Sequence, residues 1–317
     1  MNTIKEICQK LNEHQKMFII PHINMDGDAL GSAVALTRAL RLIGKEAYIL
    51  LEDEIAANIS FMAKDYCTMD QNIIEPDLSI CIDCGQIDRF KEREEAFLKA
   101  DETMCIDHHS TSKGIADYNY IDPASPATGQ IVFQIVKELG ITGDKEIGEA
   151  IFAAITTDTG NFQYSNTNKE SFLIAAELMD WGIDTNHVTV EIYQNERLER
   201  ILIENKVMGT LCTISDGKGA VAYVTQKMLE ETGAEMSETE ACVSKLRDIK
   251  GVEISAFIKE IGDGTCKVSM RAKTYGNVAK IAEKYEGGGH TKAAGFTLHS
   301  ELSEAFDIVK REIEESL

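Results

Sequence analysis

The 317-residue sequence has no long apolar run and no excess of positive charge. A membrane-spanning helix needs about 20 consecutive apolar residues, and no run approaches that length, so we expect no membrane partner. Lys and Arg number 32 against 53 Asp and Glu, which gives a net charge of −21. Proteins that coat long nucleic acid depend on dense Lys and Arg contacts with phosphates. The charge therefore argues against such a partner, but it does not exclude a small anionic substrate held by a local cluster of cations and metals.

The sequence also lacks the marks of a secreted protein. Its first residues, MNTIKEICQKLNEHQK, contain no apolar signal-peptide segment. The eight cysteines are scattered, and several, such as Cys81 and Cys105, lie in apolar strand-like runs. This pattern indicates buried, reduced thiols in a cytoplasmic protein. Cys81 and Cys84 form one CxxC pair, but no second pair follows at zinc-ribbon spacing, so we assign no zinc to it.

The N-terminal part of the sequence alternates strand-like and helix-like stretches. Short apolar runs typical of strands lie at 17–20, 47–51, 78–82 and 103–106, and helical patterns lie at 28–44, 89–100, 127–140 and 145–158. This alternation predicts βαβ units around a mostly parallel sheet flanked by helices. We therefore expect an α/β fold with a first domain over residues 1–185.

The C-terminal part is predicted to form a second, smaller α/β domain over residues 209–317. A polar helical pattern over 186–208 predicts one long linker helix before it. Strands are then predicted around 216–225, 252–260 and 266–273, helices near 237–248 and 277–285, and a glycine cluster at the close of the domain. No internal repeat or low-complexity tract is visible.

Four segments of the first part place carboxylates and imidazoles directly after apolar stretches. They contain His22, Asp26 and Asp28; Asp83; Asp107, His108 and His109; and Asp158. The carboxyl ends of parallel strands meet at one edge of a sheet, where ligands bind. We therefore expect these side chains to converge although the segments are far apart in sequence.

The first of these segments, between the first strand and the helix that follows it, indicates which kind of site to expect. A dinucleotide-binding fold has glycines there, so that a pyrophosphate meets a helix N-terminus, whereas Asp26 and Asp28 would repel phosphate. Carboxylates this dense must be neutralised, most simply by metal ions. Four aspartates and two or three histidines suffice for two divalent ions that share a carboxylate. Oxygen ligands suit Mg²⁺ or Mn²⁺ and imidazoles favour Mn²⁺, so the residues predict a two-metal phosphoryl-transfer or hydrolysis site.

Each of these residues also has a plainer interpretation when taken alone. A single aspartate after a strand is usually a helix cap, and Asp28 could cap the helix that follows it. We interpret His14, His187 and His299 as ordinary polar residues. The occurrence of four such segments in order, each after an apolar stem, favours the metal site for the others.

The motifs themselves resemble a known family. HINMDGDALGS, DCG at 83–85, DHH at 107–109 and TDTGNF at 157–162 resemble the four motifs of the DHH phosphoesterase superfamily. VSMRAK (268–273) and EGGGHTKAAGF (286–296) resemble the DHH-associated domain found in RecJ-like nucleases and NrnA-type oligoribonucleases. The length is most similar to the NrnA-type nanoRNase and pAp phosphatase branch.

The resemblance implies a role for each matching residue. One metal ion would be held by His22, Asp26 and Asp83, and the other by Asp28, Asp83, His108 and Asp158. His109 would face the scissile phosphate and stabilise its charge, and Asp107 would orient a ligand histidine through its ring N–H. The second domain would bind substrate through Arg271, Gly287, Gly288, Gly289, His290 and Lys292. Independently of the resemblance, consecutive glycines let backbone N–H groups approach an anion closely.

The function expected from the resemblance is hydrolysis of short RNA to mononucleotides and of 3′-phosphoadenosine 5′-phosphate (pAp), with two divalent ions. Mn²⁺ is the expected metal, with Mg²⁺ or Co²⁺ as alternatives, and relatives suggest a homodimer. An alternative substrate is cyclic di-AMP or its linear dinucleotide product. The C-terminal motif argues against a pyrophosphatase or exopolyphosphatase, and the complete ligand set argues against a non-catalytic nucleotide-binding module. The sequence leaves the preferred substrate and the cleavage polarity open.

Overall fold

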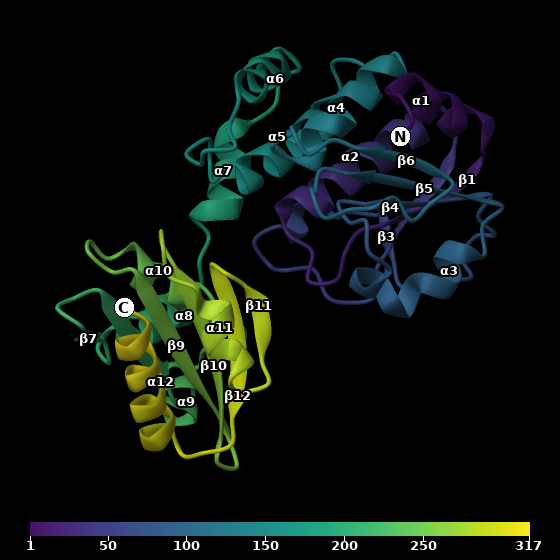
Figure 1. The fold of residues 1–317 in the computed structure, drawn as a ribbon. Coiled ribbons are helices and arrows are strands. Elements are labelled where there is room, and N and C mark those ends of the chain that lie inside the picture. The colour runs from purple at the N-terminus through teal and green to yellow at the C-terminus, as the bar shows by residue number, and fades with distance from the viewer. The chain divides into compact units, whose positions relative to one another are not determined.

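Two six-stranded sheets organise the computed structural model, which describes residues 1–317 (Figure 1). The chain divides into two units, Met1–Asn195 and Glu196–Leu317. The first sheet has the order β3-β2-β1-β4-β5-β6, and all its neighbouring strands are parallel. Its strands are β1 (Lys16–Ile20), β2 (Glu46–Leu50), β3 (Cys67–Thr68), β4 (Leu78–Ile82), β5 (Glu102–Asp107) and β6 (Tyr118–Ile121). The predicted parallel α/β sheet is confirmed, and its strand order reverses between β1 and β4, where α/β folds bind ligands.

Helices cover both faces of this sheet (Figure 1). On one face lie α1 (Ile4–Glu13), α2 (Gly27–Leu42), α4 (Thr128–Glu138) and α5 (Lys145–Asp158); on the other lie η2 (Ile87–Arg93) and α3 (Glu94–Leu98). The short η1 (Ser60–Met62), α6 (Lys169–Asp180) and α7 (Thr185–Tyr193) complete the unit. None of the structure's helices combines the length and the apolar composition that crossing a membrane requires.

The close packing of α2 on α5 brings two segments of the predicted site together, the one with Asp28 and the one with Asp158. A Cβ atom at Gly31 would lie 2.4 Å from the carbonyl oxygen of Ala150, and one at Gly27 would lie 2.4 Å from the side chain of Thr157. Only glycine fits at these two positions, because any side chain would push the helices apart. The N-terminus of α2 therefore lies against the C-terminal end of α5, which ends at Asp158.

The charged stretch at 89–100 is not the single helix that the sequence predicts. The chain forms the 3-10 segment η2 and then the short helix α3, with non-helical angles at Phe90 (φ −145°, ψ 43°). Phe90 leaves the helical path because its ring is buried in the core, edge-to-face with Phe97 at 5.2 Å. Core packing overrides the local helical pattern here.

The single linker helix expected over 186–208 is also wrong. The structure has two helices, α7 and α8 (Leu198–Met208), separated at residues 194–197. Val188 and Ile192 of α7 pack into the core of the first unit, whereas Ile203 and Val207 of α8 pack into the second. Because the two halves bury their apolar faces in different units, the polar segment between them does not continue the helix.

The second unit is a mixed sheet with helices on both faces (Figure 1). Its order is β11-β12-β10-β9-β8-β7, antiparallel except between β8 and β9. The strands are β7 (Cys212–Ile214), β8 (Gly219–Val224), β9 (Ile254–Gly262), β10 (Thr265–Ala272), β11 (Gly288–His290) and β12 (Ala293–Leu298). Helices α11 (Val278–Glu283) and α12 (Leu302–Ser316) cover one face, and α8, α9 (Gln226–Thr232) and α10 (Cys242–Asp248), with the turn η3 (Met236–Thr239), cover β8 and β9 on the other. The predicted α/β character is confirmed, but the glycine cluster is followed by β12 and α12, which the sequence interpretation did not anticipate.

Candidate metal centre

Asp26 and Asp28 lie where the loop after β1 turns into α2. Asp26 is the N-cap: its Oδ1 accepts hydrogen bonds from the backbone N–H groups of Asp28 and Ala29, each at 3.0 Å. Asp28, which the sequence alone could have made the cap, is only 1% exposed. Its carboxylate accepts from the N–H groups of Thr128 (2.7 Å) and Gly129 (2.9 Å) at the start of α4. The N-terminal amides of α4 thus hold Asp28 in the site and stabilise its charge.

Asp83 follows β4 in a left-handed backbone conformation, with φ +57°. Its Oδ1 accepts a hydrogen bond from the Thr128 hydroxyl at 2.7 Å. Oδ1 also lies 3.6 Å from Nε2 of His108, and Oδ2 lies 3.6 Å from Nε2 of His22. These two separations exceed a hydrogen bond, whereas two ligands at roughly 2.0–2.2 Å from one divalent ion lie roughly 3–3.5 Å apart. The two oxygens of one buried carboxylate therefore face two different imidazoles.

The two imidazoles are oriented by backbone carbonyls. Nδ1 of His22 lies 2.7 Å from the carbonyl oxygen of Ile23, and Nδ1 of His108 lies 3.1 Å from that of Ser125. When each Nδ1 donates to its carbonyl, each Nε2 is left with a lone pair directed at the carboxylates. This is the tautomer that a metal-binding histidine adopts.

The structure brings together the six side chains predicted as metal ligands. Three groups have all their ligand atoms within 4.8 Å of one another: His22, Asp26 and Asp83; Asp28, His108 and Asp158; and Asp83, His108 and His109. The first group is the first predicted ligand set, and the second group contains three of the four residues of the other set. The fourth, Asp83, lies within 4.0 Å of both His22 and His108.

The electrostatics of this cluster call for added positive charge. Burial, together with the neighbouring charge of Asp83, raises the pKa of Asp28 well above its usual range. Burial likewise raises the pKa of Asp158 to about 6. The basic groups within 4.0 Å of these carboxylates are imidazoles, not lysine or arginine. Divalent cations would neutralise the cluster without protonation, so the donor set of carboxylate oxygens and imidazoles fits Mn²⁺ or Mg²⁺.

Asp107 orients a different histidine from the one expected. Its Oδ1 lies 2.7 Å from Nδ1 of His109, whereas His108 is oriented by the Ser125 carbonyl. The prediction that Asp107 holds a ligand histidine is therefore wrong. Asp107 is fully buried, and its Oδ1 accepts from the backbone N–H groups of His108 and His109, where the chain turns after β5. This places Oδ1 against the ring of His109. Its hydrogen bond raises the pKa of His109 to about 9.

A pocket of about 260 Å³ opens over the cluster within the first unit. Its wall includes the predicted ligands His22, Asp26 and Asp83, together with His109 and Arg89. His109 is half-exposed, so its Nε2 edge is accessible from this pocket. The volume suits a phosphate and part of a nucleoside better than a duplex.

The second unit aligns two of the predicted substrate-binding residues across its sheet. Arg271 of β10 pairs with Ala293 of β12, which in turn pairs with His290 of β11. Cross-strand partners point to the same face of a sheet, so Arg271 and His290 lie on one face. The alternate residues Val268 and Met270 pack into the core on the other face.

The three predicted glycines form the edge of this sheet. A Cβ atom at Gly287 would lie 2.4 Å from the carbonyl oxygen of Gly295, and one at Gly289 would lie 2.4 Å from that of Ala293. Gly289 also has φ +138°. At both positions the glycine is required by close backbone packing, and Gly288 between them is exposed with open space beside it.

Lys292 is exposed, and its ammonium contacts backbone. Its ammonium lies against the carbonyl oxygens of Thr274 and Gly276, the latter at 3.2 Å. Residues 274–276 form a loop that Glu253 also holds. The Glu253 carboxylate accepts hydrogen bonds from the three successive backbone N–H groups of this loop at 2.7–2.8 Å. Lys292 thus helps to fix the loop that follows Arg271.

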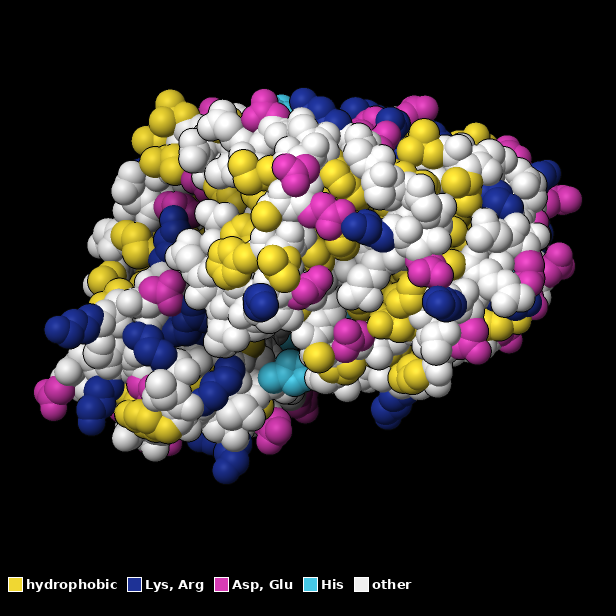
Figure 2. Space-filling model, turned by 90° about the horizontal axis from the view of Figure 1, so that it is seen from above, with side chains coloured by type: hydrophobic (Ala, Val, Ile, Leu, Met, Phe, Trp, Pro, Cys, Tyr) yellow, Lys and Arg dark blue, Asp and Glu magenta, His cyan; other side chains and the backbone are white.

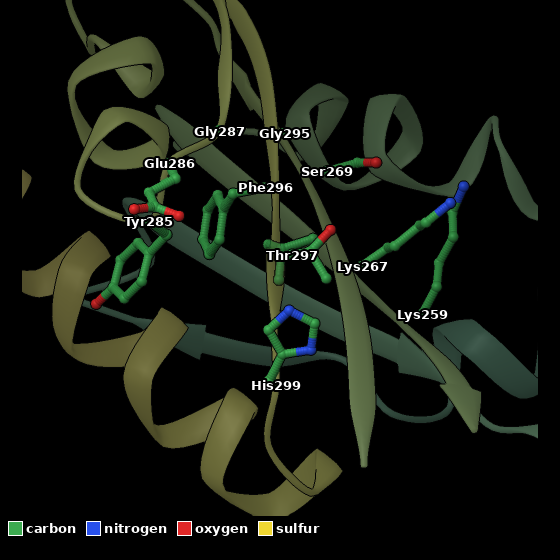
Figure 3. Close-up of a pocket in the computed structure, with 11 residues that line it drawn as sticks. Lys259, Lys267, Ser269, Tyr285, Glu286, Gly287, Gly295, Phe296, Thr297 and His299 are labelled. Atoms are coloured by element: carbon green, nitrogen blue, oxygen red, sulfur yellow. The ribbon is translucent and has the colours of Figure 1, made fainter. Parts of the chain in front are cut away.

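A second pocket lies on the same polar face of this sheet (Figure 3). Lys267 and Ser269 of β10 and Thr297 of β12 point from neighbouring strands into it, with His299 beyond the end of β12 and the Gly287 edge at its far end. These positions alternate with buried Val268 and Phe296. The polar face of β10 and β12 is therefore continuous with the row of Arg271 and His290.

Sequence reasoning missed four residues that shape the first site. They are the hydroxyl donor Thr128, the carbonyl of Ser125, Ser112, which donates to Asp107, and Arg89. Ser112 and Arg89 lie within six residues of a motif aspartate, and this proximity was the one signal available. Near Thr128 and Ser125 the sequence predicts only the start of a helix. Nothing in the spacing indicates that this helix start lies against Asp28 and Asp83.

Comparison with known proteins assigns the chain to a family. The model of the DHH family N-terminal domain matches residues 16–157, and the DHHA1 domain model matches residues 216–315. A bifunctional oligoribonuclease and PAP phosphatase NrnA from Thermus thermophilus is 31% identical over 305 residues, which cover 95% of this chain and 90% of the relative. The chain is a DHH-family phosphoesterase. The two family models fall one in each structural unit.

Solved structures of similar fold agree with this DHH architecture. An exopolyphosphatase-related protein from Bacteroides fragilis superposes with a TM-score of 0.89 at 24% identity, covering 98% of this chain and 95% of that one. The exonuclease RecJ bound to manganese superposes with a TM-score of 0.56 at 15% identity, covering 99% of this chain and 94% of that one. At these identities the likeness shows that the two-unit fold is shared.

Proposed function

We propose that this DHH phosphoesterase hydrolyses short RNA oligonucleotides to mononucleotides and also dephosphorylates pAp. The observation that supports this most directly is the position of Asp83, whose two oxygens face His22 and His108 separately at 3.6 Å. A carboxylate between two imidazoles is suited to hold two ions side by side. The near-full-length relative from Thermus thermophilus is named as an oligoribonuclease and PAP phosphatase, which favours this substrate class.

In this proposal each half of the cluster holds one ion. His22, Asp26 and Asp83 are the ligands of the first, and Asp28, Asp83, His108 and Asp158 are the ligands of the second. We propose Mn²⁺, because two imidazoles join the carboxylates. When bound, such ions lower the pKa of water and neutralise phosphate oxygens.

The remaining residues of the first site act on the substrate's charge. His109 presents its imidazole to the pocket, and its hydrogen bond to Asp107 keeps the ring oriented and favours its protonated form. A protonated imidazole donates to a non-bridging oxygen of the scissile phosphate and stabilises the charge that develops there. Asp107 is fully buried, so it positions His109 and does not touch substrate.

The second unit is proposed to bind the part of the substrate away from the cleaved bond. Arg271 and His290 share one face of its sheet, next to the exposed edge at Gly288. Burial and the nearby guanidinium of Arg247 lower the pKa of Arg271, and a phosphate beside it would compensate this repulsion. Lys292 would contribute through the loop that it fixes.

The charge of the chain favours short over long nucleic acid. On the surface that Figure 2 shows, acidic side chains lie among the basic ones. The net charge of −21 works in the same direction, because long polymers are attracted mainly through many phosphate contacts. The pocket of about 260 Å³ also suits a phosphate and part of one nucleoside rather than a longer stretch of polymer.

A substrate panel tests this proposal. Purified protein with Mn²⁺ is given, separately, RNAs of two to five nucleotides, a 24-nucleotide RNA, pAp, cyclic di-AMP and a short polyphosphate, and initial rates are compared. We expect the short RNAs and pAp to be consumed fastest and the 24-nucleotide RNA slowly. Preferential loss of cyclic di-AMP or its linear dinucleotide, or of polyphosphate, would replace the proposed substrate while leaving the metal centre in place.

A further inference from the structure

Arg89 lies on the wall of the pocket over the metal centre. The same wall contains the ligand side chains of His22, Asp26 and Asp83, and, farther along, His109. Arg89 is the one lysine or arginine among the residues that line this pocket. An exposed guanidinium therefore opens onto the space that a phosphate would enter.

The backbone of Arg89 is fixed on both sides. Its carbonyl oxygen accepts a hydrogen bond of 2.7 Å from the N–H group of Ile23, the residue after His22. The next residue, Phe90, is fully buried, with its ring against Phe97. Arg89 is thus held between the loop after β1 and the hydrophobic core, and only its side chain extends into the pocket.

The positive charge of Arg89 has no carboxylate partner. Its Nη2 lies 3.0 Å from Nδ1 of His22, but that nitrogen also lies 2.7 Å from the carbonyl oxygen of Ile23. When His22 donates to this carbonyl, as a metal-binding tautomer requires, its Nδ1 has no lone pair to accept from Arg89. The guanidinium donors are then left without a protein acceptor.

Two other arginines of the first unit have protein partners. Arg93, four residues along, donates to a carboxylate oxygen of Glu52 at 2.8 Å and to the carbonyl of Leu50 at 2.7 Å. Arg38 forms two bonds with Asp144, at 2.7 and 2.8 Å. Both are structural ion pairs, whereas Arg89 presents its planar set of donors to a pocket.

We propose that Arg89 binds a non-bridging oxygen of the substrate's phosphate, beside the proposed metal ligand His22, as a substrate-binding residue outside the sequence motifs described above. This role rests on the phosphoesterase function proposed above. A guanidinium matches the oxygens of a phosphate with parallel N–H donors and keeps its charge at every relevant pH. Arg89 would hold the phosphate in the pocket before and during cleavage.

The test measures binding separately from turnover. The dissociation constant of AMP is measured by calorimetry in Mn²⁺ for the wild type, Arg89→Met, Arg89→Lys and the control Lys91→Met, whose ammonium lies on the same segment, exposed and paired with Glu94. We expect Arg89→Met to weaken AMP binding by about 10- to 100-fold, Arg89→Lys to recover part of the loss, and Lys91→Met to match the wild type. Bound manganese and the melting temperature should be unchanged in every variant.

Each other outcome would contradict either the phosphate-binding role of Arg89 or the proposed RNA substrate. Unchanged AMP affinity in Arg89→Met, or no AMP binding by the wild type, would overturn the role of Arg89. A loss of AMP affinity that follows a loss of bound manganese would also overturn it, since Arg89 would then act through His22. Wild-type protein that binds AMP through Arg89 but leaves short RNA intact would reject the proposed substrate and keep the phosphate-binding role.

Discussion

Nδ1 of His109 lies 2.7 Å from Oδ1 of Asp107, two residues earlier on the same turn after β5. The carboxylate is fully buried, and it also accepts from the hydroxyl of Ser112. Burial acts to raise the pKa of Asp107, but the hydrogen bonds from His109 and Ser112 outweigh it and lower that pKa. The pair therefore has a fixed geometry with its negative charge inside and its positive charge at the pocket.

The first prediction concerns the protonation of His109. In the metal-free protein its pKa is raised to about 9, chiefly by the hydrogen bond to Asp107, so the ring is protonated at neutral pH and loses its proton as the pH rises through that value. NMR titration of the imidazole signals, with His109→Gln to identify its signal, should give a midpoint near 9. Asp107→Asn should move the midpoint down toward the usual value near 6.5, and the exposed control Asp101→Asn should not. A wild-type midpoint below 7 would contradict the proposed role of the pair.

A second prediction concerns the stability of the second unit at low pH. Glu253 is buried, and although burial acts to raise its pKa, hydrogen bonds from the backbone of residues 274–276 and from the Thr274 hydroxyl lower it to about 2. A carboxyl whose pKa is lowered by folding stabilises the protein above its unfolded pKa, near 4.5, and that stabilisation is lost as the pH falls from there to about 2. Glu253→Gln should therefore lower the free energy of unfolding by about 3 kcal/mol at pH 7.

Urea unfolding at several pH values checks this stability prediction. The difference between wild type and Glu253→Gln should shrink steadily below pH 4.5, while the exposed control Glu283→Gln should resemble the wild type throughout. A difference that is the same at pH 7 and pH 3 would show that packing, rather than charge, accounts for the effect of Glu253.

The convergence of the candidate ligands could be predicted from sequence because each of them follows an apolar stretch in a parallel fold. His22 and Asp83 follow neighbouring strands of the sheet, so their convergence is a consequence of topology. Asp158 joins them through the packing of α5 on α2, where Gly31 permits close approach.

The parts that sequence could not supply depend on three-dimensional contacts between distant segments. The resemblance predicts that Asp107 orients a ligand histidine, whereas it orients His109, because spacing alone cannot tell which of two adjacent rings faces a buried carboxylate. The helix break at Phe90 arises from core packing that local helical pattern does not record. Thr128 contributes a hydroxyl to Asp83 across 45 residues of sequence, and no local motif marks it.

The metal ions proposed for this site depend on one residue more than on any other. Asp83 is 2% exposed and lies between His22 and His108, so replacing it should affect both ions at once. Removal of Asp28 or Asp158 would affect only the second.

The most direct measurement is bound manganese together with hydrolysis of a three-nucleotide RNA, on the same preparations of wild type and Asp83→Asn. Asp263→Asn, in the β9–β10 turn of the second unit, is the control. We expect two manganese ions per chain and rapid hydrolysis in the wild type and the control. For Asp83→Asn we expect loss of bound manganese and a fall in activity of at least about 100-fold. Full activity with undiminished manganese in Asp83→Asn would contradict the shared-carboxylate centre.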